Sequence, residues 1–261
     1  MKKLYYITVI LISVIFFGCE KSNIVEIPLP FEEDVVVQGR LITGQTFQGI
    51  RITKTIPVNE TYDITKAEIK DAFVYLKIND VRVIPLHYTS DGIYMPVSNF
   101  YLSAGSTYEL FGQANGRSFY SKTIIPQNVI VINSDYNSEG NYMEANVQVN
   151  PGEVYGGIWI IDRSAATSAV DFYSIVSQTN DDPDVLARTT VMPEKYSSPI
   201  YNERRFIQVY AFDKQFKPFF NSKDNNQPVG NYFIQGGGSI AWNVYGDHVI
   251  GLFIGIAISH L

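Results

Sequence analysis

From Val35 onward the chain is a succession of short runs rich in β-branched and aromatic residues, and turn-forming residues separate one run from the next. This feature constrains the fold most, because runs of about six to eight residues match the length of β-strands and are short for helices. The first runs are 35–42, 47–53, 71–78, 81–88, 92–97, 106–113 and 117–124. Seven short strands in so little chain predict an antiparallel β-sandwich at residues 35–125.

Alternation and turns agree with that prediction. In the run 71–78, one side carries Phe73, Tyr75 and Lys77, and the other carries Val74, Leu76 and Ile78. Asn79–Asp80 follows this run, and Asn115–Gly116 separates the last two runs. Both pairs are typical of two-residue hairpin turns, so we expect the flanking strands to be antiparallel neighbours.

A second β-rich module is predicted at residues 126–261. Pro126 marks the boundary, because proline has no backbone N–H to donate to a sheet and biases Ile125 toward an extended conformation. The strand-like runs beyond it are 129–132, 142–149, 155–162, 171–177 and 204–213. Phenylalanines at helical spacing predict one short helix within 213–222, and Pro218 limits its length.

The chain closes with a strongly apolar segment, 236–259. Its final run is too short and too rich in glycine for a helix that spans a bilayer, which needs about 20 apolar residues. We therefore expect buried strands, packed inside the second module.

The N-terminus has the pattern of an export signal. Lys2 and Lys3 precede an apolar run that ends at Phe17, and Gly18 then stands before Cys19. A small residue before a cysteine resembles a bacterial lipobox, so we predict a signal peptide at 1–18 and lipid attachment at Cys19. An ordinary secretory signal with a chance cysteine and an uncleaved anchor are the alternatives. Residues 19–34 are polar, acidic and proline-containing, and we interpret them as a tether.

Charge and cysteine content exclude several kinds of chemistry. Cys19 is the only cysteine, so a lipidated chain has none left for a disulfide, a zinc thiolate or a cysteine nucleophile. Loss of Lys2 and Lys3 takes the formal charge from −6 to −8. An acidic chain of this kind is a poor candidate for binding nucleic acid or an anionic lipid surface. The predicted contact with the membrane is therefore through the lipid attached to Cys19.

Two acidic loops could hold a cation. Segment 135–141 resembles the front half of a calcium loop, but Asn146 stands where the bidentate acid belongs, so a β-turn is the preferred interpretation. Segment 180–184 carries three carboxylates, and a solvated loop is again preferred.

Motifs for catalysis are few. No pair among His87, His248 and His260 has metal-ligand spacing, and no serine stands in a G-x-S-x-G elbow. Segment 236–240 lacks the lysine of a phosphate loop. Paired carboxylates that meet only in the fold stay open, but nothing singles out a pair. We predict no catalytic residue, no metal site and no cofactor.

The many aromatic residues suggest a carbohydrate or peptide platform, although aromatics are also ordinary core residues of β-sandwiches. Trp159 and Trp242 lie in strand-like runs and are predicted to be core residues. Tyr196, Tyr201 and Tyr232 lie among Ser, Pro, Asn and Gly, and they are the candidate contact aromatics.

Four segments in order carry a family resemblance: "CEKSNIVEIPLP", "DVVVQGRL", the sandwich with "DAFVYLKI", "DGIYMP" and "AGSTYELFGQANGRSFYSKTIIP", and "PVGNYFIQGGGSIAWNVYGDHVIGLFIG". Together they resemble the domain-of-unknown-function 4249 family of Bacteroidetes lipoproteins, and the middle stretch also resembles transthyretin-type sandwiches. The resemblance implies an outer-membrane, lipid-anchored protein of the cell envelope and association with a TonB-dependent transporter. It supplies no catalytic residues.

The combined expectation is an all-β protein with an Ig/transthyretin-like sandwich followed by a β-rich module. Its expected role is that of a non-catalytic accessory that binds a ligand or a TonB-dependent outer-membrane transporter. A structural subunit, such as an adhesin or pilus component, is the alternative, and an enzyme comes third.

Overall fold

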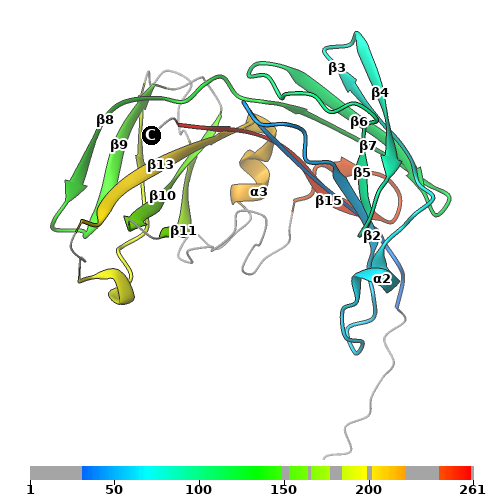
Figure 1. Ribbon diagram of the computed structural model, residues 1–261, viewed down its shortest axis with the longest axis horizontal. Helices are drawn as coiled ribbons and strands as arrows, with labels where there is room; N and C mark the ends of the chain where they lie inside the picture. The colour runs from blue at the N-terminus through cyan, green and yellow to red at the C-terminus, as the bar shows by residue number, and fades with distance from the viewer. Residues whose placement is uncertain are drawn as a thin grey trace, which may run out of the picture. The chain divides into compact units, whose positions relative to one another are not determined.

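Strands make up most of the described chain, and its helices are short (Figure 1). The computed structural model describes residues 31–148, 153–163, 166–176, 184–198, 202–221 and 241–259. The sheets are large and mainly antiparallel, which confirms the predicted all-β, sandwich-like fold class. The described residues from Glu33 onward form one compact unit. None of the described helices has the length and apolar character needed to cross a bilayer.

The elements follow the predicted runs closely. The strands are β1 (Val35–Ile42), β2 (Ile50–Lys54), β3 (Phe73–Ile78), β4 (Arg82–Tyr88), β5 (Ile93–Met95), β6 (Thr107–Ala114), β7 (Arg117–Ile124), β8 (Ile130–Asn137), β9 (Tyr142–Gln148), β10 (Val154–Arg163), β11 (Ala166–Val176), β12 (Asp184–Arg188), β13 (Arg204–Phe212), β14 (Val244–Tyr245) and β15 (Val249–Ile258). The helices are α2 (Ile64–Ala67), η1 (Glu194–Tyr196), η2 (Lys214–Phe216) and α3 (Lys217–Asn221). Strand β12 and helix α2 lie outside the runs that the sequence predicted as strands or helix.

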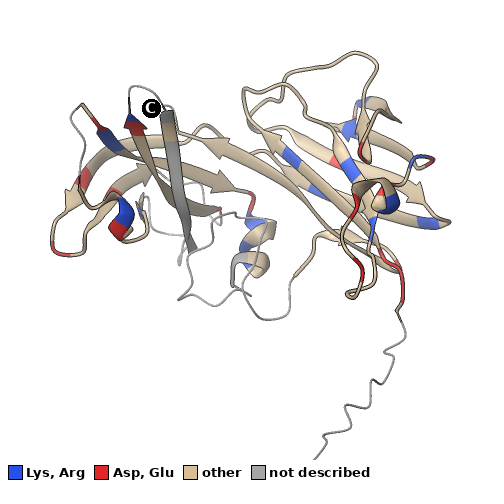
Figure 2. Ribbon diagram, turned by 60° about the horizontal axis from the view of Figure 1, so that its bottom comes forward, with Lys and Arg blue, Asp and Glu red and all other residues tan. Residues whose placement is uncertain are grey.

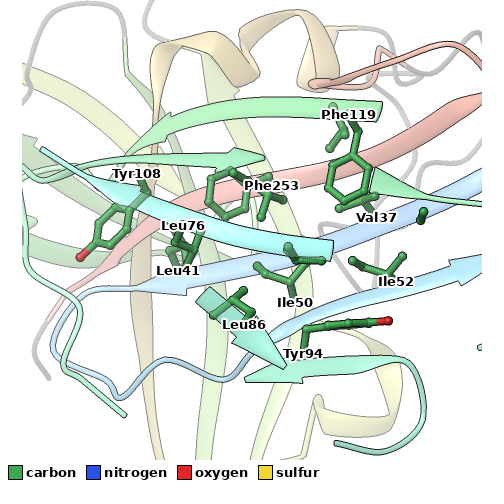
Figure 3. Close-up of a cluster of buried hydrophobic side chains, with 14 of the residues drawn as sticks. Val37, Leu41, Ile50, Ile52, Leu76, Leu86, Tyr94, Tyr108, Phe119 and Phe253 are labelled. Carbon is green, nitrogen blue, oxygen red and sulfur yellow. The ribbon is translucent and has the colours of Figure 1, made fainter. Parts of the chain in front are cut away.

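The larger sheet has the strand order β11-β10-β13-β15-β1-β2-β5-β4-β3-β6-β7-β14. It folds over on itself, because side chains from β1 and β2 share one core with side chains from β3, β6 and β7. Figure 3 shows part of this sandwich core, with Leu41 and Ile50 from one side and Leu76 and Phe119 from the other. The smaller sheet has the order β12-β9-β8.

Both predicted hairpin turns are present. Asn79 and Asp80 have φ values of 48° and 61°, and Asn115 and Gly116 have values of 48° and 74°. Positive φ at both central positions is the geometry that matches the twist of paired strands. Aspartate is tolerated at the second position of the first turn because its carboxylate accepts a hydrogen bond from Lys77.

The C-terminal strand β15 is buried as predicted, but its predicted place wholly inside the second module is wrong. It pairs in parallel with β1 from Val35↔Val249 to Ile42↔Ile256, and antiparallel with β13. Its two faces serve different cores: Phe253 lies in the sandwich core, and Leu252 and Ile254 lie in a cluster with Phe212. An apolar run buried on both faces is typical of such a central strand. The division of the chain at residues 125 and 126 stays a prediction.

The predicted helix in 213–222 is confirmed as η2 followed by α3. Asp213 caps it, because its carboxylate accepts the backbone N–H of Gln215. The same buried carboxylate accepts the N–H of Ile124 at 2.8 Å, so it joins the end of β7 to the helix. Pro218 is tolerated because it stands in the first turn of α3, where backbone N–H groups have no partner within the helix.

Candidate functional site

The residues singled out from the sequence differ in where the structure places them. Cys19, Tyr201 and Tyr232 lie outside the described residues. Trp159 is a core residue, as predicted, whereas Trp242 keeps 36% of its surface exposed, so its placement in the core is wrong. Trp242 stands two residues before Val244, the first residue of β14, which is the last of the described strands in the order of the larger sheet. Tyr196 lies in η1 and is half-buried.

The acidic segment 135–141 is the predicted β-turn. Residues 135–137 end β8 and residues 138–141 turn the chain into β9, and the Asn137 side chain accepts the backbone N–H of Gly140 at 2.9 Å. Asn141 follows with a φ of 53°. Of the segment 180–184, only Asp184 is described. Among the described residues, no group of three or more His, Cys, Asp and Glu side chains is placed to hold a metal ion.

An aromatic row crosses the outer face of the sheet β4-β3-β6-β7-β14. We use this name for Phe73, Tyr75, Phe111, Tyr120 and Tyr245. Four of these residues stand directly opposite one another across four strands, because the pairings are Tyr75↔Phe111, Phe111↔Tyr120 and Tyr120↔Tyr245. Phe73 precedes Tyr75 by two positions on β3 and therefore lies on the same face.

Four of the five rings of the row contact one another in sequence. Those of Tyr75 and Phe111 are stacked, with centroids 5.0 Å apart and planes 8° apart. Phe111 and Tyr120 are tilted at 4.9 Å, and Phe73 meets Tyr75 edge to face at 5.9 Å. Pairs of this kind stabilise a sheet by about 0.2–1 kcal/mol each, so part of the row's role is structural.

Stability alone does not account for the exposure of the row. Phe73 is 66% exposed and Tyr245 is 62% exposed. The opposite face of the same strands is the sandwich core, where Val74, Leu76 and Leu110 are buried. The apolar side chains of the row therefore form a continuous strip on the solvent side of a sheet that already has a core, which is the arrangement expected of a contact surface.

A charged row runs beside the aromatic row. Glu109 lies between two lysines, with Lys77 Nζ at 3.3 Å and Lys122 Nζ at 3.7 Å from its carboxylate oxygens. The Tyr120 hydroxyl donates to Glu109 at 2.9 Å. Burial and this hydrogen bond raise the pKa of Tyr120, so its hydroxyl remains a neutral donor at ordinary pH. The charged row therefore forms a polar border along one side of the aromatic row.

Sequence reasoning missed the aromatic row. Its local signal was present, since the run 71–78 has large apolar or aromatic residues on both sides of the strand. A half-buried strand normally shows such residues on one side only. The row becomes visible only when the registers of β3, β6, β7 and β14 are known.

Tyr196, the described candidate contact aromatic, lies among basic residues. The Arg163 guanidinium is 5.4 Å from the Tyr196 ring centroid, and Lys195 Nζ is 4.8 Å from it. Arg205 donates to the Tyr196 carbonyl oxygen. Beneath them, the Tyr196 side chain packs on the buried cluster of Trp159, Ile161 and Met192. We call Arg163, Lys195, Tyr196, Glu203 and Arg205 the Tyr196 cluster.

Glu203 organises this cluster. Its side chain is fully buried, and its two carboxylate oxygens accept the Nε–H groups of Arg163, at 2.7 Å, and of Arg205. Burial by itself raises the pKa of Glu203, but the hydrogen bonds from Arg205 and Arg163 outweigh it and hold the pKa below its usual value. The carboxylate is therefore ionised at neutral pH and holds both guanidinium groups in fixed positions.

Basic and acidic residues are interspersed along the described chain rather than separated by sign (Figure 2). The aromatic row is mainly apolar, whereas the Tyr196 cluster is rich in cationic side chains. They lie on different strands, the first on β3, β6, β7 and β14 and the second at β10, η1 and β13.

Comparison with known proteins identifies a family. No curated protein matches the chain. A DUF4785 family protein from Legionella pneumophila aligns in structure with 11% identity and a TM-score of 0.29, over 67% of this chain and 50% of that one. This chain thus spans half the length of that protein. A cytokine receptor complex aligns with 10% identity and a TM-score of 0.24, over 70% of this chain and 91% of that one. Both TM-scores are too low to indicate a shared fold.

The comparison of sequences, in contrast, identifies the family. The family profile described as "Domain of unknown function (DUF4249)" matches residues 22–245. This range includes all four strands of the aromatic row and the whole Tyr196 cluster. The chain belongs to the DUF4249 family.

Proposed function

We propose that this protein is a non-catalytic accessory lipoprotein of the cell envelope that docks onto a TonB-dependent outer-membrane transporter through its aromatic row. Lipid on Cys19 would hold it at the outer membrane. The observation that carries the proposal is the exposed strip of contacting rings, bordered by the charged row of Lys77, Glu109 and Lys122. Aromatic residues with a polar border are typical of protein–protein interfaces.

The orientation of the rings favours a protein partner over a sugar. Tyr75 and Phe111 are stacked on one another, so each ring covers a face of its neighbour. A sugar ring stacks on a free aromatic face, and this pair leaves fewer faces free than a flat platform. Ring edges and the exposed side chains of Phe73 and Tyr245 instead suit the side chains of a protein surface.

The tether supports a membrane partner. Asn115, in the turn after β6, donates to Glu33, where the predicted tether meets the sandwich. Phe111 stands four residues before Asn115, about 14 Å along the strand. The 16 residues from Cys19 to Asp34 reach at most about 55 Å when extended. A lipid on Cys19 would therefore keep the folded unit within about 55 Å of the membrane, where a membrane protein can be reached.

One observation favours the alternative of a structural subunit. Strand β8 is an end strand of the three-stranded sheet (Figure 1). Ile130 and Ile132 on this strand are exposed. Among the described strands it pairs with β9 alone, so one edge offers backbone groups to an added strand. Concentration-dependent polymers of the purified chain that disappear when Ile132 is replaced by Pro would favour this alternative.

Co-purification tests the main proposal. Tagged wild-type chain, extracted from envelopes in mild detergent, should recover a large outer-membrane barrel protein. The double variant Phe73→Ser/Tyr245→Ser should lose it, because the most exposed apolar side chains of the row are gone. Tyr62→Ser is the matched control, since Tyr62 is 61% exposed and lies outside the row. Recovery of no barrel, or equal recovery by the double variant, would refute the proposal.

A further inference from the structure

The Tyr196 cluster carries more positive than negative charge. The two guanidinium groups of Arg163 and Arg205 share one carboxylate, that of Glu203. Asp162 does not balance them, because it pairs with Arg204. Glu194 begins η1, but within the described residues it makes no ion pair with either arginine. Lys195 adds a third positive charge beside the Tyr196 ring.

The guanidinium groups are also positioned with unused donors. Each gives its Nε–H to the buried Glu203, and Arg205 gives one Nη–H to the Tyr196 carbonyl. In the part of the chain that the structure describes, the Nη atoms of Arg163 and the second Nη of Arg205 donate no hydrogen bond. Both side chains keep contact with solvent, at 32% and 22% exposed. A guanidinium held through Nε still has Nη–H groups that can donate to a ligand.

Fixed Nη donors, surplus positive charge and a nearby aromatic ring are the features that bind oxyanions. Arginine binds carboxylate and phosphate through two parallel N–H···O bonds, and preorganised donors lose little entropy on binding. We propose that the Tyr196 cluster binds a ligand through an oxyanion group, a phosphate or a carboxylate, held by Arg163 and Arg205 with Lys195 contributing charge. This site is separate from the aromatic row and does not depend on the transporter proposal.

Calorimetric titration of the purified soluble chain, residues 20–261, tests the inference at constant ionic strength set with NaCl. Inorganic phosphate and acetate are the probes, and they distinguish a phosphate site from a carboxylate site. At least one of them should bind saturably with a stoichiometry near one. Lys195→Gln and Arg163→Lys should each weaken that binding about tenfold, which is about 1.4 kcal/mol. Lys195 makes no ion pair in the described structure, so its replacement leaves the fold in place.

Arg204→Gln is the matched control, because Arg204 lies on the same strand, is 78% exposed and pairs with Asp162 outside the cluster. It should bind the probe as the wild type does. Equal weakening in Arg204→Gln and Lys195→Gln would mean a general charge effect and overturn the site. Absence of saturable binding by both probes would also overturn it. Thermal unfolding of each variant shows whether it is folded. If Arg163→Lys does not fold, the binding measured for Lys195→Gln decides the test.

Discussion

Replacing Phe253 with Ala should destabilise the whole folded unit. Phe253 is fully buried in the sandwich core, on the strand that pairs with both β1 and β13. Truncating a buried phenylalanine to alanine costs about 3–5 kcal/mol, through lost apolar burial and the cavity that remains. Domains are stable by only about 5–15 kcal/mol, so this one substitution removes a large part of the total.

The assay is urea unfolding, followed by far-UV circular dichroism and by tryptophan fluorescence. A Trp242→Phe background leaves Trp159 as the only tryptophan. Trp159 is buried in the cluster with Ile161 and Met192, away from the sandwich core. Because β15 pairs with β13, and β13 pairs with the strand β10 that carries Trp159, Phe253→Ala should move both transitions to lower urea together. Val58→Ala is the control, since Val58 is fully exposed and should change stability by less than about 0.5 kcal/mol.

Two results would refute this reasoning. A loss below about 1 kcal/mol would mean that Phe253 is not a core residue of the folded protein. A Trp159 transition that stays at the wild-type midpoint, while the circular dichroism transition moves, would mean that β15 and β13 do not couple the sandwich core to the cluster around Trp159.

Three further predictions concern the anchor, the strand pairing and pH. Cys19→Ser should leave the protein out of the membrane fraction, and normal maturation with full membrane retention would contradict lipidation. Gly251→Ala should cost several kcal/mol in urea unfolding, because its Cβ would stand 2.0 Å from the carbonyl oxygen of Val37 on β1, and an unchanged midpoint would contradict the parallel pairing. The pKa of Glu203 is lower in the folded state, so its ion pairs stabilise the fold above its unfolded pKa of about 4.5, and this contribution is lost as pH falls through the folded value. The melting temperature of the wild type should therefore fall more steeply below pH 4.5 than that of Glu203→Gln. Parallel curves of melting temperature against pH would contradict this prediction.

The strands were predictable because their signal is local. Alternation in 71–78 and the Asn79–Asp80 and Asn115–Gly116 turns depend on neighbours in the chain, and the structure has β3, β4, β6 and β7 at those places. Strand β12 was missed because it is short and stands in a polar segment. The role of β15 was missed for another reason: its partner β1 lies some 200 residues away, and period-two patterns do not identify a partner.

The candidate sites depend on register in the same way. Tyr196 was found from its local composition, but Arg163 and Arg205 meet at Glu203 only because β10 and β13 pair as Asp162↔Arg204. The aromatic row needs three consecutive registers to align. Such alignments leave little trace in a single sequence, because each residue by itself resembles an ordinary strand aromatic.

Site-specific photo-crosslinking in intact envelopes tests the central claim, that the aromatic row contacts a partner, most directly. Benzoylphenylalanine placed at Phe73 or at Tyr245 should give, after irradiation, one discrete adduct that contains an outer-membrane barrel protein. The same group at Tyr62, which is equally exposed outside the row, should give none. Adducts of equal yield at all three positions, or no adduct at Phe73 and Tyr245, would contradict the account.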